Sequence, residues 1–253
     1  MAFSELCIPG KVIKPKCPWD NHYWFNGGMT RIWGTTVMAY RLNRAPCLVV
    51  LSELDERFEV NRSKILFELN ANSVIPEDPR LIRVGDRLGM FYAGIRNTPN
   101  CEMYYAELDA GWNIVKNEMC RYDDDSPDKM LTKKLYGVSQ QKNWSPFFVD
   151  GRLVCLYSHR PMTLIAKGRD KWEPVFKGVP VEWDYGEIRG GAPPVRIGDE
   201  WYEVFHSAVE TKASNGKRSK VYYAGMLTFS DKFKPLRITR NPIMAADKAE
   251  KHG

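Results

Sequence analysis

The sequence contains no long apolar run and no sustained helical pattern. No stretch approaches the roughly 20 apolar residues that a membrane-spanning helix needs. The first ten residues lack the basic segment followed by an apolar run that is typical of a secretory signal. No long segment repeats apolar residues at i, i+3, i+4 and i+7 between capping residues. We therefore expect a cytoplasmic protein that has no membrane contact and little helix.

Several chemical signatures are also missing. The chain has no P-loop, no G-x-G-x-x-G after a strand, no G-x-S-x-G and no H-E-x-x-H. No two cysteines form a C-x-x-C pair, and their spacings fit no zinc template. We expect free thiols in a reducing compartment, although a disulfide between Cys7 and Cys17 stays open. Nothing here implies a metal ion or an organic cofactor. The six cysteines are Cys7, Cys17, Cys47, Cys101, Cys120 and Cys155.

The charge is mild and the aromatic content is high. The 253 residues carry 37 Lys plus Arg and 31 Asp plus Glu, which gives a net charge of +6. These charges are scattered and form no basic stripe, so a dedicated nucleic-acid binder is excluded. Aromatic residues make up 12% of the chain and include eight tryptophans. That content favours β-structure and stacking against sugar rings.

Short alternating runs separated by turn residues dominate the chain. The dipeptides Gly85-Asp86, Asp150-Gly151 and Gly198-Asp199 each stand between two apolar runs. They predict tight type I′ hairpins, whose two central residues both need positive φ. The hairpins recur in units that begin near residues 78, 143 and 191, and an earlier unit begins near Phe25.

Repeated units of three or four short strands are typical of propeller blades. Four blades are expected near residues 24–70, 78–120, 135–177 and 190–238. The two chain ends would complete a short fifth blade, since closure removes open sheet edges. The sequence therefore predicts an all-β, single-domain, five-bladed β-propeller over residues 1–253. A β-sandwich is the structural alternative.

Unusual polar strings stand at related places in these units. In a propeller, the loops that lead into the innermost strands rim one mouth, so these strings are expected to converge there and form a small-molecule site. The strings are Phe25-Asn26-Gly27-Gly28, Tyr40-Arg41, Glu77-Asp78-Pro79-Arg80, Lys142-Asn143, His159-Arg160-Pro161, Gly190-Gly191-Ala192-Pro193-Pro194 and the later His206.

In this order, the strings resemble the motifs of the five-bladed propeller glycosidases, most closely glycoside hydrolase family 130. That family contains β-mannoside phosphorylases and β-1,2-mannosidases. The resemblance covers about residues 24–240, and E-D-P-R is its most specific string. It implies that Asp78 is the general acid that protonates the glycosidic oxygen. It also implies that Asn26 and Arg41 bind sugar nearby.

The resemblance further implies a phosphate-binding cluster, which contains Asn143, His159, Arg160 and His206. Lys142 stands where phosphorylases commonly have arginine, so it keeps the charge and loses the bidentate fork.

Glu187 departs from the phosphorylase pattern. It lies nineteen positions before His206, where the pattern has lysine. A carboxylate there would repel a phosphate dianion by about 1–4 kcal/mol. It suits a water nucleophile with Glu187 as general base. An inverting hydrolase of this kind would hold Asp78 and Glu187 about 6.5–9.5 Å apart. If Glu187 points away instead, inorganic phosphate becomes a cosubstrate.

The preferred function is inverting cleavage of a β-linked glycoside, a mannoside, by hydrolysis or phosphorolysis. A non-catalytic carbohydrate-binding or assembly propeller is the alternative. A metal-dependent glycosyltransferase that uses Asp123-Asp124-Asp125 is a more distant one, because a solvated loop explains that run as well.

Structural interpretations stay open for most of the candidate residues. A turn before Pro79 is the structural explanation for Asp78, and packing at a strand edge is the structural explanation for Asn143. His159-Arg160 suits a salt-bridged strand end. His206, which ends a predicted apolar strand, suits a hydrogen-bonded core histidine.

Overall fold

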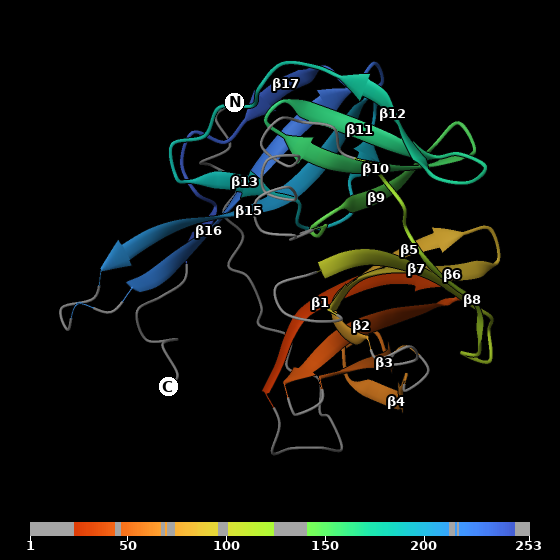
Figure 1. Ribbon diagram of the computed structural model, residues 1–253. Helices are drawn as coiled ribbons and strands as arrows, with labels where there is room; N and C mark the ends of the chain where they lie inside the picture. The colour runs from red at the N-terminus through yellow and green to blue at the C-terminus, as the bar shows by residue number, and fades with distance from the viewer. Residues whose placement is uncertain are drawn as a thin grey trace. The chain divides into compact units, whose positions relative to one another are not determined.

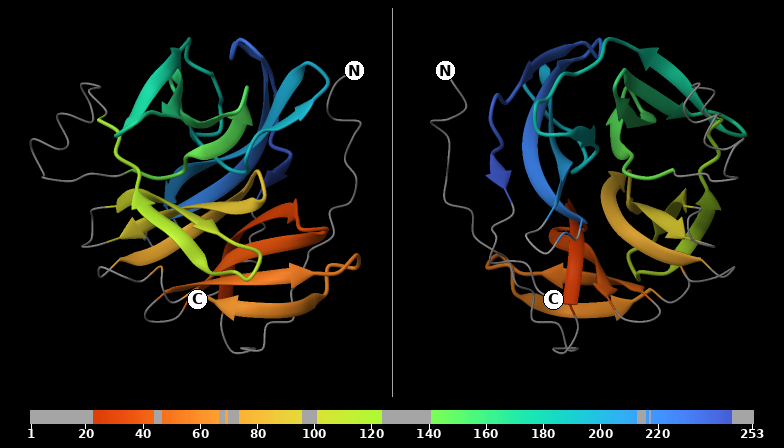
Figure 2. Two further views of the ribbon diagram at one scale, coloured as in Figure 1. Left: turned by 90° about the vertical axis from the view of Figure 1, so that its right-hand side faces the viewer. Right: turned by 60° about the vertical axis from the view of Figure 1, so that its left-hand side comes forward.

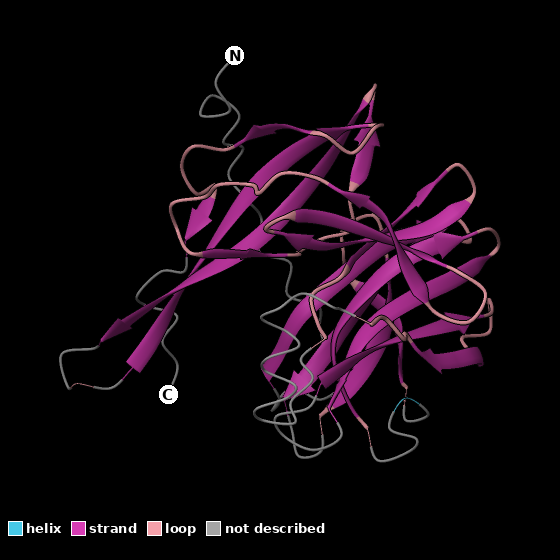
Figure 3. Ribbon diagram, turned by 45° about the horizontal axis from the view of Figure 1, so that its top comes forward, coloured by secondary structure: helices cyan, strands magenta, loops and turns pink. Residues whose placement is uncertain are grey.

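The structure is a computed structural model that describes residues 23–43, 47–66, 69, 74–95, 101–123, 141–212, 216 and 218–245. The described residues form eighteen strands and no α-helix, and strands dominate the ribbon in Figure 3. No helix of the described segments has the length and apolarity needed to cross a bilayer.

The strands form four antiparallel sheets, labelled in Figure 1. The first contains β1 (Tyr23–Ile32), β2 (Thr35–Asn43), β3 (Leu48–Leu54) and β4 (Val60–Ile65). The second contains β5 (Ile75–Val84), β6 (Arg87–Ile95), β7 (Cys101–Leu108) and β8 (Ile114–Met119). The third contains β9 (Ser145–Val149), β10 (Arg152–His159), β11 (Met162–Lys167) and β12 (Trp172–Lys177). Each of these three is a simple meander of neighbouring strands.

The fourth sheet has six strands in the order β13-β15-β16-β17, with β14 beside β15 and β18 beside β16. Its strands are β13 (Glu187–Arg189), β14 (Val195–Ile197), β15 (Glu200–Lys212), β16 (Arg218–Ser230), β17 (Pro235–Ile238) and β18 (Met244–Ala245).

The predicted all-β arrangement of propeller blades is confirmed, and the predicted count of five is wrong. Repeated four-stranded antiparallel meanders are the blades of propellers, and the described residues form four sheets. They begin and end close to the four predicted ranges. Met244–Ala245, near the C-terminus, pairs with β16 in the fourth sheet and starts no further one. The other terminal residues expected in a fifth blade, 1–22 and 246–253, lie outside the described residues.

The chain divides into two compact units. Of the described residues, the N-terminal unit holds 23–146 and 167–173, and the C-terminal unit holds 147–166 and 174–245. In the N-terminal unit, β1 and β2 both contact β5, so the first two sheets are neighbours. Figure 2 shows these sheets in red to orange and in yellow to yellow-green.

The first sheet is buried on both faces. Along β2, Val37 and Ala39 pack into one apolar cluster, and Met38, Tyr40 and Leu42 pack into another. Successive side chains of a strand point to opposite faces, so both faces of β2 are covered. This explains why the segment is an almost continuous apolar run. The C-terminal unit has its own core, which includes Phe147, Leu156, Leu164, Trp201, Phe205 and Phe229.

The predicted hairpins form, but only one of the three has the predicted turn type. Asp150 and Gly151 both have positive φ, at 48° and 74°, as a type I′ turn requires. In the other two turns only the glycine does, with Gly85 at 62° and Gly198 at 61°. Glycine alone at the first central position is the pattern of a type II′ turn. A further type I′ pattern joins β1 to β2, where Trp33 and Gly34 have φ of 54° and 77°.

Candidate functional site

Two bulges on neighbouring inner strands carry Asn26 and Asp78. The pairing of β1 with β2 shifts register between Phe25 and Gly28, and the pairing of β5 with β6 shifts between Glu77 and Arg80. Asn26 and Asp78 lie inside these bulges with φ of 50° and 53°. Among residues other than glycine, asparagine and aspartate adopt this region most readily. Bulges of this kind redirect side chains at functional sites.

The two bulges lie against each other because residue 28 is a glycine. A Cβ atom built on Gly28 would lie 2.7 Å from the carbonyl oxygen of Pro79 and 3.0 Å from the Cα of Arg80. Contacts this close do not occur for real Cβ atoms, so a side chain here would force the strands apart. The missing side chain thus lets β1 approach β5 at the level of Asn26 and Asp78.

Asn26, Arg41 and Asp78 are brought together, as the motif order predicts. The Asn26 amide Nδ2 donates to Oδ1 of Asp78 at 2.6 Å, and Nη1 of Arg41 donates to the same oxygen at 3.5 Å. The Asp78 side chain is 27% exposed. No contact to Oδ2 is found among the described residues. The two donors therefore fix the orientation of the carboxyl group through one of its oxygens.

Glu77 belongs to the same cluster, although it was not among the predicted site residues. Its Oε1 lies 2.9 Å from Nη1 of Arg41, so one guanidinium contacts both carboxylates. Burial raises the pKa of Glu77, and repulsion from Asp78 acts in the same direction, while attraction to Arg41 and Lys142 lowers it. In a regular strand, consecutive residues point to opposite faces. The bulge breaks that rule and allows both carboxylates to meet Arg41.

We expect Glu77 to make the protein less stable as the pH rises. Because its pKa is raised in the fold, the folded state binds this proton more tightly than the unfolded chain does. The stabilisation is complete below the ordinary glutamate pKa and is lost as the pH rises through the raised value. Urea denaturation at pH 4 and at pH 7 gives the free energy of unfolding of the wild type and of Glu77→Gln. The decrease in this free energy from pH 4 to pH 7 should be smaller in Glu77→Gln than in the wild type. An equal fall in both proteins would contradict this.

Arg80 is a second residue near Asp78 that was not among the predicted site residues, and it is 8% exposed. Its Nη1 donates to the carbonyl oxygen of Trp144 at 2.6 Å, and its Nη2 donates to Oδ1 of Asn143 at 3.3 Å. Asn143 has a φ of 65°, like the other two left-handed positions, and precedes β9. Arg80 thereby orients Asn143 from the strand that carries Asp78. Lys142 is exposed beside it.

His159 and Arg160 lie in the C-terminal unit, at the end of β10, and each contacts a carboxylate. Nε2 of His159 lies 2.7 Å from Oε2 of Glu203, and both side chains are buried. Nη2 of Arg160 lies 3.0 Å from Oε2 of Glu182, and both side chains are 69% exposed. These contacts match the alternative interpretation of a salt-bridged strand end. A role for either residue in phosphate binding stays a prediction.

Glu187 and His206 occupy neighbouring strands of the fourth sheet. Oε2 of Glu187 lies 3.1 Å from Nη2 of Arg189, and the Glu187 side chain is 74% exposed. His206 is half-buried in the middle of β15. The sequence predicted that this strand ends at His206, and it continues to Lys212 instead. The predicted pairing of Glu187 with Asp78 across a water molecule stays a prediction, since the two residues belong to different units.

His206 and Arg41 hold equivalent places in their own sheets. Arg41 pairs with Phe25, the last residue before the bulge of β1. His206 pairs with Arg189, the last residue before the break between β13 and β14. Arg41 on β2 and His206 on β15 therefore each lie opposite the residue at which the neighbouring strand, β1 or β13, loses its regular pairing.

The described segments contain no cluster of His, Cys, Asp or Glu arranged to hold a metal ion. Asp123 is exposed and pairs with Lys171 at 3.3 Å, while Asp124 and Asp125 lie outside the described residues. Cys47, Cys101, Cys120 and Cys155 are free thiols, and Cys7 and Cys17 also fall outside the described residues.

The chain is similar to one curated protein of known activity. No protein-family model matches it. It is 24% identical over 175 residues to a 1,2-beta-oligomannan phosphorylase from Thermoanaerobacter sp. (strain X514). The match covers 66% of this chain and 52% of that protein, so the chain spans about half the length of the curated relative.

Two solved structures from Leishmania mexicana share the fold. One is MPT-1, a GDP-Man-dependent mannosyltransferase, with a TM-score of 0.60 and 13% identity over 90% of this chain and 71% of that one. The other is MPT-4, a mannose phosphorylase in complex with a phosphate ion, with a TM-score of 0.57 and 11% identity over 90% and 70%. With the curated relative, they support a propeller like those of glycoside hydrolase family 130.

Proposed function

We propose that the chain cleaves a β-linked mannoside by phosphorolysis, with Asp78 as the proton donor. The observation that carries the proposal is the cluster of Asn26, Arg41 and Asp78, in which both donors contact one carboxyl oxygen. The similarity to a 1,2-beta-oligomannan phosphorylase supports the substrate class.

The geometry suggests how this reaction would run. The Oδ2 atom of Asp78 would transfer its proton to the glycosidic oxygen as the C1–O bond breaks. The carboxylate left behind would be stabilised by the Asn26 amide and the Arg41 guanidinium. A nucleophile attacking C1 from the opposite face of the sugar would invert its configuration.

Phosphate is preferred over water as the nucleophile because of the surroundings of Glu187. A general base must be free to accept a proton from water, whereas Glu187 is largely exposed and paired with Arg189. The resemblance supplies basic and amide residues for the phosphate, among which Lys142 and Asn143 lie beside Glu77 and Arg80.

The test uses the purified protein with a β-1,2-linked mannan oligosaccharide, with and without inorganic phosphate. We expect mannose 1-phosphate to form only when phosphate is present. Release of free mannose in the absence of phosphate would show that the reaction is hydrolysis and not phosphorolysis. Oligosaccharide binding without any product would favour the non-catalytic carbohydrate-binding propeller. Absence of both binding and products would reject the substrate class.

A further inference from the structure

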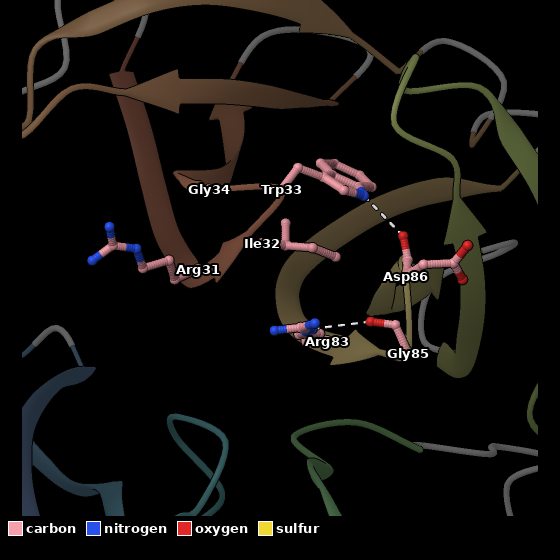
Figure 4. A pocket seen from close by; sticks show the side chains of 7 residues that line it. All are labelled: Arg31, Ile32, Trp33, Gly34, Arg83, Gly85 and Asp86. Atoms are coloured by element: carbon pink, nitrogen blue, oxygen red, sulfur yellow. Dashed lines mark hydrogen bonds between the residues drawn. The ribbon is translucent and has the colours of Figure 1, made fainter.

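A separate pocket lies at the other ends of β1 and β5, within the N-terminal unit. The β1–β2 turn and the end of β5 with its own turn enclose about 390 Å³, a volume in the usual range for small-molecule sites. Figure 4 shows its lining, which consists of Arg31, Ile32, Trp33, Gly34, Arg83, Gly85 and Asp86.

This pocket is distinct from the cluster around Asp78. Arg31 follows Asn26 by five residues on β1, and Arg83 follows Asp78 by five residues on β5. At a rise of roughly 3.3 Å per residue, each arginine lies about 16 Å along its strand from the bulge. No residue is shared between the two sites.

Trp33 forms a fixed wall of the pocket. Its φ of 54° is unusual for a bulky aromatic residue, and strained conformations of this kind concentrate at functional sites. The indole Nε1 donates to the carbonyl oxygen of Asp86 at 2.8 Å, which ties the β1–β2 turn to the β5–β6 turn. Ile32 lies beside it in the lining but is only 2% exposed and belongs to the core. The half-buried indole of Trp33 therefore supplies the apolar surface on which the hydrophobic face of a sugar ring packs.

Arg31 and Arg83 provide positive charge that no carboxylate neutralises among the described residues. Both side chains are exposed. Arg83 donates from Nε to the carbonyl oxygen of Gly85 at 2.9 Å, which leaves its two terminal nitrogens available. In Figure 4 both guanidinium groups extend toward the same side, while the Asp86 carboxylate points the other way. Planar guanidinium groups with available donors match the oxygens of a phosphate.

The geometry points to a binding site for a sugar phosphate. Arg31 and Arg83 would hold the phosphate, and the indole of Trp33 would contact the sugar ring. The inference stands on this pocket alone and is independent of catalysis by Asp78.

The indole N–H of Trp33 gives a local readout of binding. In the ¹⁵N-labelled protein, this resonance is assigned by its loss in Trp33→Phe. Titration with mannose 1-phosphate should shift it to saturation. Removing both guanidinium groups, in Arg31→Ala combined with Arg83→Ala, should weaken binding by about tenfold or more. The matched control is Arg87→Ala, which removes an exposed arginine of the same hairpin that pairs with Glu107 outside the pocket, and it should bind as the wild type does.

Each other outcome overturns a stated part of the inference. An unmoved Trp33 resonance in the wild type would reject the site. Equal affinity in the double variant and in Arg87→Ala would reject the two arginines as the phosphate ligands. If inorganic phosphate binds as tightly as mannose 1-phosphate, the contact between Trp33 and the sugar ring is rejected. If mannose alone binds as tightly as mannose 1-phosphate, the requirement for a phosphate group is rejected. Because no turnover is measured, a failure of the proposed catalysis leaves this test intact.

Discussion

Asp78→Asn is expected to lower the rate of β-mannoside phosphorolysis by about 10²–10⁴-fold, the usual contribution of a general acid. The amide has no proton acidic enough to transfer to the glycosidic oxygen. The fold should survive, since asparagine tolerates the left-handed conformation at this position and its amide oxygen still accepts from Asn26. The measurement is kcat for release of mannose 1-phosphate, together with the thermal midpoint of each protein.

Asp150→Asn is the matched control for this substitution. Asp150 also has positive φ, at 48°, but it lies in the exposed β9–β10 turn. Its variant should therefore retain full activity. If Asp78→Asn also retains full activity while the wild type is active, Asp78 is not the proton donor and another group must supply the proton.

His159→Leu is expected to lower the free energy of unfolding by about 1–3 kcal/mol, the range for taking a hydrogen-bond partner away from a buried polar group. The substitution leaves Glu203 buried at 0% exposure without its histidine partner. The loss is measured by chemical denaturation. Because the pair lies wholly within the C-terminal unit, the result reports on the stability of that unit.

A double-mutant cycle separates the contact between His159 and Glu203 from the packing around it. His159→Leu combined with Glu203→Leu should be more stable than His159→Leu alone, because the second change removes the buried carboxylate that has lost its histidine partner. Additive losses would show that the two side chains do not stabilise each other. The exposed pair of Arg160 and Glu182 offers a comparison, for which the expected loss is about 0–1 kcal/mol.

Local signals were sufficient to predict the sheets. Two-residue turns such as Asp150-Gly151 mark hairpins without any knowledge of the tertiary structure, and the four blade ranges follow from their recurrence. The fifth blade was inferred from the need to close the open sheet edges with the two chain ends, and most of those residues lie outside the described ones. The length of β15 was underestimated because its polar end, from Glu210 to Lys212, pairs with β16 through the backbone rather than by apolar alternation.

The site was predicted in part, and what was missed has a structural cause. Motif order anticipated that Asn26, Arg41 and Asp78 lie close together, and their roles stay predictions. Glu77 and Arg80 were missed although they stand in the same string as Asp78. Their contacts depend on the bulge and on partners up to 65 residues away, which no local pattern encodes. His159 and Glu203 are likewise 44 residues apart, so their pairing requires the folded sheets.

The close approach at Gly28 has a consequence for how residues of this site are recognised. The positions of Asn26 and Asp78 depend on residue 28 having no side chain, because a Cβ there would lie 2.7 Å from the Pro79 carbonyl oxygen. A glycine offers no charge, no donor and no nucleophile, and a survey of reactive side chains would pass over it. Engineering of this protein should therefore keep residue 28 fixed together with Asn26, Arg41 and Asp78.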